Sequence, residues 1–172
     1  MMKVRIFQVG LVALLMVLVV FASACMDPKD RRPGLGLSGE VVSEPINDWS
    51  FSDEYQQIYL ETQTWYLIPH SVTTVCAGLG DKLYVPSIYY EGGEWPEKYW
   101  NSNVSSDPRV RLEMEGKIYE REAVVVEDPV EFQAALRALA AKYPFWQEML
   151  AKPESERPDM SMVRMDPRRR AH

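Results

Sequence analysis

The chain has 172 residues, of which 47% are hydrophobic and 26% are charged. This length suits one domain, and this composition provides enough apolar side chains for a packed core, which excludes a wholly disordered chain. The formal net charge of −6 argues against a nucleic-acid-binding protein, because such a protein needs a basic surface to neutralise phosphates. Residues 168–172 form a short basic tail that does not change this conclusion.

The first 24 residues predict a secretory signal peptide. Lys3 and Arg5 supply the positive start, an apolar run covers residues 9–21, and small residues follow at 22–24. The apolar run is shorter than the roughly 20 residues that a membrane-spanning helix needs. Loss of this segment removes two positive charges, so the mature chain is more acidic still.

Cys25 directly follows the small residues, and the segment resembles the lipobox of bacterial lipoproteins. In that family the cysteine is diacylated before cleavage, and two acyl chains anchor a protein stably to a membrane. The resemblance implies lipidation of Cys25 and a location in the bacterial cell envelope, outside the cytoplasm. The alternative is ordinary cleavage after Ala22 or Ala24, with Cys25 incidental.

The remaining cysteine, Cys76, then has no partner for a disulfide within the chain. It lies among β-branched residues of a predicted strand, which favours a small buried hydrophobic side chain over a catalytic nucleophile. Residues 25–37 are rich in Pro, Gly and charge, and predict a flexible linker between the lipidated cysteine and a domain at 38–167.

Alternating and β-branched segments predict an antiparallel sheet. A short first strand is expected within residues 38–44. Residues 55–62 favour a second strand, with a short helix begun at Ser52 or Asp53 as the alternative. Residues 70–77 and 82–87 are expected to pair as a hairpin around residues 78–81, with Pro86 at the end of its strand or at a sheet edge.

A second hairpin is expected with Glu115 and Gly116 at its turn. This register places Arg111 opposite Glu120 and Arg109 opposite Glu122, and each such pair contributes roughly 0.2–1 kcal/mol. Both arginines thereby receive a structural explanation. Leu112 and Met114 would point to the buried face.

Asp128, Pro129 and Glu131 predict the start of a helix, as N-cap, first-turn proline and capping-box acid. Apolar residues then recur at helical spacing up to Pro144, so this amphipathic helix should pack on the sheet through Phe132, Leu136, Leu139 and Tyr143. Residues 96–103 suit a helical turn, and residues 160–165 a last strand.

The chain shows no nucleophile elbow, Walker loop or dinucleotide glycine motif, so the catalytic residues stay unknown. His70 and His172 are too few for a histidine metal site, and no metal is expected. His70 is better explained as a partly exposed residue at the edge of the sheet than as a catalytic base. Between residues 87 and 106, five aromatic residues either line a ligand or partner surface or cover the mouth of the fold: Tyr89, Tyr90, Trp95, Tyr99 and Trp100.

This order of elements resembles the split β-barrel of the pyridoxamine 5′-phosphate oxidase-like superfamily, which includes flavin- and deazaflavin-binding members. The residues that carry the resemblance are Leu-Tyr-Val-Pro-Ser at 83–87, a connector bearing Lys98 and Asn101, and Asp-Pro-Arg-Val at 107–110. The resemblance implies an α+β fold, mainly an antiparallel split β-barrel with one packed amphipathic helix and a short helical connector. It also implies a homodimer with FMN or a deazaflavin at the subunit interface.

Carried over by position, Ser71 and Thr73 would face the cofactor, Ser87 and Lys98 would bind its phosphate, and Asn101 would add a hydrogen bond. The acids Glu91, Glu94 and Glu97 would lie close to that phosphate. Two hypotheses follow. The first is a lipid-anchored flavin-type protein, with oxidoreductase activity as its enzymatic form. The second is a cofactor-free ligand-binding or protein-interaction lipoprotein on the same fold.

Overall fold

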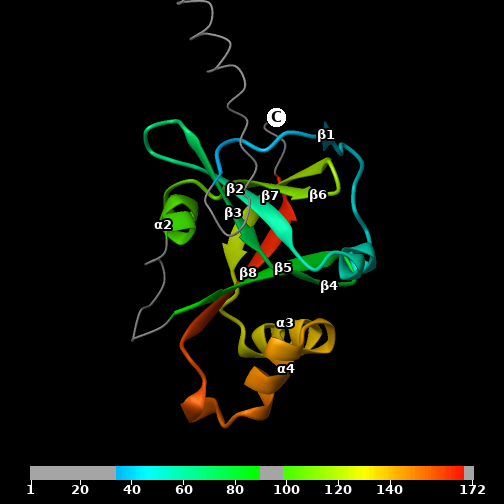
Figure 1. The fold of residues 1–172 in the computed structure, drawn as a ribbon, viewed down its shortest axis with the longest axis vertical. Coiled ribbons are helices and arrows are strands. Elements are labelled where there is room, and N and C mark those ends of the chain that lie inside the picture. The colour runs from blue at the N-terminus through cyan, green and yellow to red at the C-terminus, as the bar shows by residue number, and fades with distance from the viewer. Residues whose placement is uncertain (1–33, 90–98, 169–172) are drawn as a thin grey trace, which may run out of the picture.

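The computed structural model describes residues 34–89 and 99–168 (Figure 1). Within them the strands are β1 (Glu40–Val41), β2 (Ile58–Gln63), β3 (Pro69–Thr74), β4 (Ala77–Leu79), β5 (Lys82–Ile88), β6 (Arg109–Met114), β7 (Lys117–Val125) and β8 (Met160–Pro167). The helices are α2 (Tyr99–Ser106), α3 (Pro129–Lys142) and α4 (Pro144–Ala151), with short 3-10 turns at Ser50–Glu54 and Glu154–Glu156.

The strands form one sheet in the order β3-β2-β6-β7-β8-β5-β4, and β1 pairs with β7. Only Val75 and Cys76 separate β3 from β4 along the chain, yet these strands lie at opposite ends of the sheet order. One bent segment therefore joins both ends of the sheet and curls it into a barrel. The side chain of Cys76 is fully buried at the bend.

The first hairpin was expected to pair residues 70–77 with residues 82–87, and this is wrong for residues 70–74. Ala77–Leu79 pairs with β5, but Pro69–Thr74 pairs with β2 instead. The physical reason is the bend at Cys76, where the chain leaves one neighbouring strand and joins another. Pro86 lies inside β5, beyond the residues that pair with β4, so it has a strand neighbour on one side only.

The second hairpin has the expected register, with Arg111 opposite Glu120 and Arg109 opposite Glu122. Glu115 and Gly116 form its turn, with φ angles of 51° and 76°. Leu112 and Met114 are buried, as expected. The last strand and the helix after Asp128 are also confirmed, and Asp128 accepts hydrogen bonds from the amides of Val130 and Glu131.

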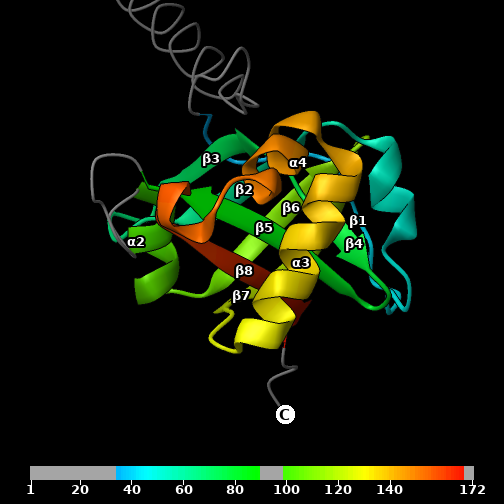
Figure 2. The ribbon, with the colours of Figure 1, turned by 90° about the horizontal axis from the view of Figure 1, so that it is seen from below.

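Two apolar cores lie on either side of the sheet. The barrel interior contains mainly side chains from alternate strand positions, including Leu60, Leu83, Leu112 and Val163. The second core lies between the sheet and helices α3 and α4, and it includes Tyr84, Leu136, Leu139, Trp146 and Met162. Figure 2 shows α3 running across β5 and β8.

The other short elements differ in extent from their expectations. The first strand is limited to Glu40–Val41. The next segment forms the strand β2, as favoured, and not the alternative helix; the 3-10 turn at Ser50–Glu54 ends before it. The expected helical turn is the two-turn helix α2. It sends Trp100 and Val104 into the barrel core, where both are buried.

Candidate functional site

The predicted cofactor residues lie on two faces of the sheet. Ser71 and Thr73 on β3 pair with Glu61 and Tyr59 of β2, while Val72 between them packs against the barrel core. Because side chains alternate along a strand, Ser71 and Thr73 face outward. On β5, Leu83 and Val85 belong to the barrel core, so Ser87 faces inward by the same alternation.

Ser71 is covered by the segment that leads into the barrel. Its backbone forms a two-hydrogen-bond bridge with Gly34, at 2.8 and 3.0 Å. Its hydroxyl donates to the carbonyl of Leu35 at 2.6 Å, and its side chain is fully buried. The hydroxyl of Ser71 is therefore already used within the chain.

Ser87 and Asn101 do come together. Asn101 of α2 donates to the hydroxyl of Ser87 at 3.0 Å and to that of Tyr89 at 2.7 Å. Both Ser87 and Asn101 are almost completely buried. Among the described residues, the side-chain oxygen of Asn101 has no hydrogen-bond partner.

The same helix also reaches the other side of the barrel mouth. Asn103 donates to the hydroxyl of Thr62 on β2 at 2.9 Å. Helix α2 is thus hydrogen-bonded to β5 through Asn101 and to β2 through Asn103, and it closes this end of the barrel. The predicted residues Lys98 and Cys25 lie outside the described residues, as do the three acids of the insert.

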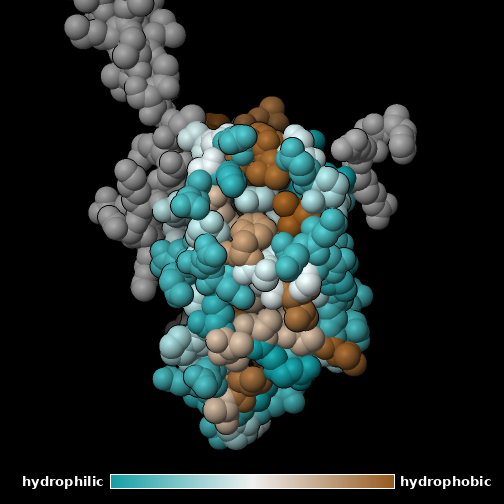
Figure 3. All heavy atoms as spheres, turned by 90° about the vertical axis from the view of Figure 1, so that its right-hand side faces the viewer, coloured by the Kyte–Doolittle hydropathy of each residue, from teal (hydrophilic) through white to brown (hydrophobic). Residues whose placement is uncertain are grey.

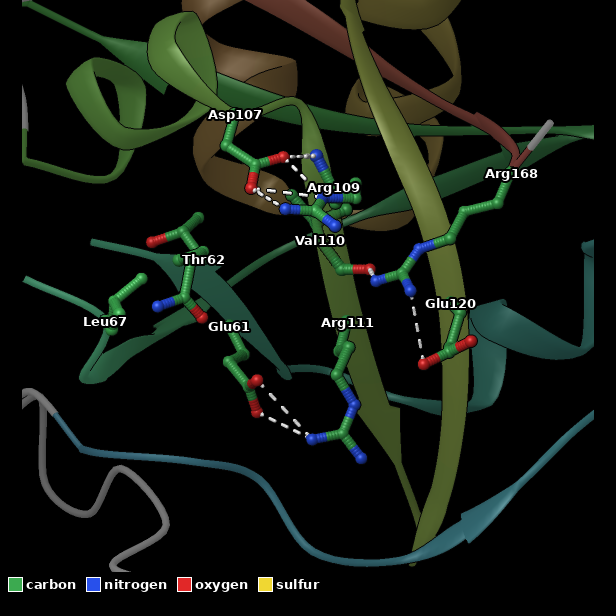
Figure 4. A pocket seen from close by; sticks show the side chains of 10 residues that line it. Glu61, Thr62, Leu67, Asp107, Arg109, Val110, Arg111, Glu120 and Arg168 are labelled. Carbon is green, nitrogen blue, oxygen red and sulfur yellow. Dashed lines mark hydrogen bonds and ion pairs between the residues drawn. The ribbon is translucent and has the colours of Figure 1, made fainter. Parts of the chain in front are cut away.

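The candidate ligand site is a cavity of about 460 Å³ on the outer face of the sheet (Figure 4). This volume lies in the range of small-molecule sites, roughly 300–1,000 Å³. Its charged lining consists of three arginines and three acids: Arg109, Arg111, Arg168, Glu61, Asp107 and Glu120. We call it the arginine pocket.

Each arginine of the pocket has an acidic partner. Arg111 lies 3.1 Å from Glu61, and Arg168 lies 3.3 Å from Glu120. Arg109 binds Asp107 through both Nε and Nη2. The cross-strand glutamates expected as partners of Arg109 and Arg111 thus stand opposite them, but the recorded ion pairs of both arginines go to other acids.

The N-terminal segment contacts Glu61 and Arg111, two of the side chains that line this site. The amide of Leu37 donates to the Glu61 carboxylate at 2.6 Å, and Arg111 donates to the Leu37 carbonyl at 3.1 Å. Residues 34–42 therefore cross the outer face of β2 and β6, from the bridge at Ser71 to β1 beside β7. We call this crossing segment the N-terminal strap.

The guanidinium groups of the pocket have further N–H donors that could bind an anion. All recorded contacts of Arg111 run through Nη1, and a guanidinium carries five N–H donors. The side chain of Arg109 is 65% exposed, and its hydrogen bonds hold the pKa of Asp107 below the ordinary value. The arrangement suits a planar or tetrahedral anion, such as a carboxylate or a phosphate, that engages Arg109 or Arg111.

Other candidate chemistry is limited in the described part of the chain. No group of three or more His, Cys, Asp or Glu residues there could hold a metal ion. Burial lowers the pKa of His70. Within residues 34–89 and 99–168, none of the helices is long and apolar enough to cross a bilayer.

No protein-family model matches the chain, and no curated protein matches it. Solved structures do match. A conserved hypothetical protein of Mycobacterium tuberculosis has a TM-score of 0.52 at 18% identity, covering 69% of this chain and 77% of its own. The haem storage protein HutZ of Vibrio cholerae has a TM-score of 0.51 at 14% identity, covering 69% of this chain and 86% of its own.

A third structure, a candidate 5-nitroimidazole antibiotic resistance protein of Bacteroides thetaiotaomicron, has a TM-score of 0.50 at 10% identity. It covers 80% of this chain and 84% of its own. The chain has an α+β split-barrel fold. The expected fold class is therefore confirmed, and at these identities the likeness concerns the fold alone.

The sequence did not identify the three arginines of the arginine pocket as site residues of the split barrel. Arg109 and Arg111 alternate on one strand, and that alternation is a signal that they share a face. Only the pairing of β6 with β2 shows that this face also carries Glu61 and borders a cavity. Arg168 was assigned to a solvated tail, but it hydrogen-bonds to the carbonyl of Val110 at 3.0 Å.

Proposed function

We propose that this chain is a lipid-anchored cell-envelope protein whose split barrel binds a flavin-type cofactor, FMN or a deazaflavin, through the arginine pocket. The observation that carries this proposal is the presence of Arg109 and Arg111 in a cavity of ligand size on the barrel surface. The fold supports it, since the resemblance that predicted this fold includes flavin- and deazaflavin-binding proteins.

The donor set of the pocket fits the phosphate of such a cofactor. A phosphate binds to guanidinium groups, and Arg109 is exposed, with its Nη1 outside the ion pair that Nε and Nη2 form with Asp107. Ser71, Ser87 and Asn101 fit less well as direct ligands, because each already hydrogen-bonds within the chain. We therefore assign the phosphate to the arginines, with Lys98 kept as the cation that the resemblance implies.

When bound, a flavin or deazaflavin supplies hydride or electron transfer, and the protein positions it. Oxidoreductase activity and a homodimer that shares the cofactor are parts of this proposal. The chain's own contribution is to hold the anionic end of the cofactor at Arg109 and Arg111. The strap contributes by holding Arg111 in place, because Arg111 donates to the Leu37 carbonyl.

Titration of the purified full chain with FMN, and separately with a deazaflavin, tests the proposal by fluorescence. Arg109→Ala should weaken binding about tenfold, which corresponds to roughly 1.4 kcal/mol. Arg137→Ala is the matched control, because Arg137 is an exposed arginine on α3 outside the pocket. Equal affinity in the two variants would remove the phosphate assignment.

The second candidate is a cofactor-free ligand-binding or protein-interaction lipoprotein on the same fold. It is favoured by the internal hydrogen bonds that engage Ser71, Ser87 and Asn101. Absence of binding by both chromophores would select this candidate. The arginine pocket would then serve a carboxylate or phosphate ligand of another kind.

The lipid anchor is tested by counting thiols. Cys76 is fully buried, and burial raises the pKa of its thiol to about 11, so it should not react in the folded protein. After denaturation, the processed protein should show one reactive thiol if Cys25 carries lipid. Two reactive thiols would contradict lipidation.

A further inference from the structure

The turn between β2 and β3 exposes a run of large apolar side chains. Trp65 is 88% exposed and Leu67 79%, while Tyr66 and Ile68 are each about half exposed. The other large exposed apolar residues of the described chain are mostly scattered singly over the surface, as Val41, Leu79, Val130 and Phe145 are. Four consecutive residues of this kind need an explanation that single ones do not.

The turn is held in this outward conformation by its own hydrogen bonds. The amide of Leu67 donates to the carbonyl of Thr64 at 3.0 Å, and the hydroxyl of Thr64 donates to the carbonyl of Ile68 at 2.5 Å. Leu67 has a φ of 65°, which is unfavourable for a residue with a side chain. The rings of Trp65 and Tyr66 pack edge to face, with 5.3 Å between their centroids. These contacts give the turn a defined conformation that holds its apolar side chains outward.

The chain segment that contains this turn carries no charged side chain, although the arginine pocket lies on one side of it. Residues 62–80 contain no Asp, Glu, Lys or Arg, although 26% of the chain is charged. Figure 3, which views the molecule from the side of β1, shows hydrophobic side chains at its upper end. The β2–β3 turn lies at the same end of the molecule, on the opposite side in Figure 1. Helices α3 and α4 lie at the opposite end.

The N-terminal strap begins beside the same turn. Gly34 bridges to Ser71, three residues after Ile68, so about 10 Å of extended strand separates the bridge from the turn. Eight residues lie between Cys25 and Gly34, and such a chain spans at most roughly 30 Å. An anchor at Cys25 would keep the turn close to the membrane surface.

We propose that the β2–β3 turn inserts Trp65, Tyr66, Leu67 and Ile68 into the interfacial layer of the bilayer as a second membrane contact. This inference rests on the lipid anchor of the proposed function. Trp and Tyr favour the membrane interface, because one end of each ring system is apolar and the other is polar. Leu67 also lines the arginine pocket, so this contact sets the pocket beside the lipid surface.

The test uses the full chain in vesicles of phosphatidylethanolamine and phosphatidylglycerol, with and without bromine on the acyl chains. Bromine quenches tryptophan emission only at close range. Brominated lipid should lower the emission of the wild-type chain, and Trp65→Phe should lose most of this decrease. Trp146→Phe is the matched control, because Trp146 is a residue of α4 buried in the core between the helices and the sheet, and its replacement should leave the decrease unchanged.

The outcomes separate this proposal from the anchor itself. Failure of the chain to sediment with the vesicles would contradict both the anchor and the contact. Sedimentation with equal quenching in the wild type and in Trp65→Phe would contradict the contact alone. Protection of Trp65 from aqueous iodide in that case would show that a second copy covers the turn.

Discussion

The carboxylate of Glu61 and the guanidinium of Arg111 lie 3.1 Å apart across β2 and β6, and both hydrogen-bond to the backbone of Leu37. This ion pair therefore holds the N-terminal strap on the outer face of the sheet. Glu61 is mostly buried by that contact, although it points away from the barrel core.

Glu61→Gln should release the strap. The change removes a charged acceptor from both Leu37 and Arg111, and hydrogen bonds to charged groups contribute about 1.5–3 kcal/mol. The free energy of unfolding should fall by a value in that range, and the Leu37 amide should exchange faster with deuterium. Glu122→Gln, which removes a carboxylate from β7, is the control. Unchanged protection of Leu37 in Glu61→Gln would show that the ion pair does not hold the strap.

Asn101→Ala should loosen helix α2 from the barrel mouth. It removes donors to Ser87 and Tyr89 in a buried site, which should cost about 1–3 kcal/mol in denaturant unfolding. A double-mutant cycle with Ser87→Ala should give a coupling energy of about 0.5–1.5 kcal/mol. Ser102→Ala, at an exposed position of the same helix, should be nearly neutral. Additive effects of Asn101→Ala and Ser87→Ala would contradict the contact.

Glu131 gives the protein an acid-sensitive contact between α3 and the sheet. Burial raises the pKa of this carboxyl, but hydrogen bonds from Tyr84, Lys82 and Arg164 outweigh burial and lower the pKa from 4.5 to about 2. A depressed pKa means that the stabilisation is complete above about pH 4.5 and is lost as the pH falls through 2.

Glu131→Gln should therefore lower the free energy of unfolding at pH 7 and flatten its decrease between pH 4.5 and 2. The loss at neutral pH should be about 1–3 kcal/mol, measured by chemical denaturation across this pH range. Glu127→Gln, which changes an exposed acid just before the helix, should keep the wild-type slope. The same slope in both variants would exclude Glu131 as its source.

Arg121 is a nearly buried cation whose guanidinium lies 5.0 Å from the ring centre of Trp49. Its recorded side-chain hydrogen bond goes to the carbonyl of Glu120, and burial lowers the pKa of this arginine. A methionine has similar length and no charge to desolvate, so Arg121→Met should leave the melting temperature unchanged or raise it. Arg121→Ala should lower it, because it leaves a cavity beside Trp49. A large loss in Arg121→Met would show that the cation contact outweighs desolvation.

The sequence was most informative where local chemistry decides the structure. The turn at Glu115 and Gly116 determined the register of β6 and β7, and Asp128 with Pro129 determined the start of α3. Those signals act over a few residues, so no knowledge of the rest of the fold was needed. The same holds for Leu112 and Met114, whose burial follows from strand alternation.

The site was harder to predict because it depends on contacts between distant segments. Ser71 and Ser87 both suit a cofactor by residue type, but the bend at Cys76 places them on opposite faces of the sheet. Arg111 has Glu120 opposite it on β7, yet it pairs with Glu61 because β2 lies on its other side. Such choices depend on which strands become neighbours, and no short pattern in the chain specifies that.

The strap also determines how the barrel would respond to mechanical force. A pull on the chain ahead of Gly34 would load the two hydrogen bonds to Ser71 first, then the contacts of Leu37 with Glu61 and Arg111, and last the pairing of β1 with β7. Tension would thus peel the strap away one contact at a time, and the split barrel behind it would be strained only after all three attachments had failed.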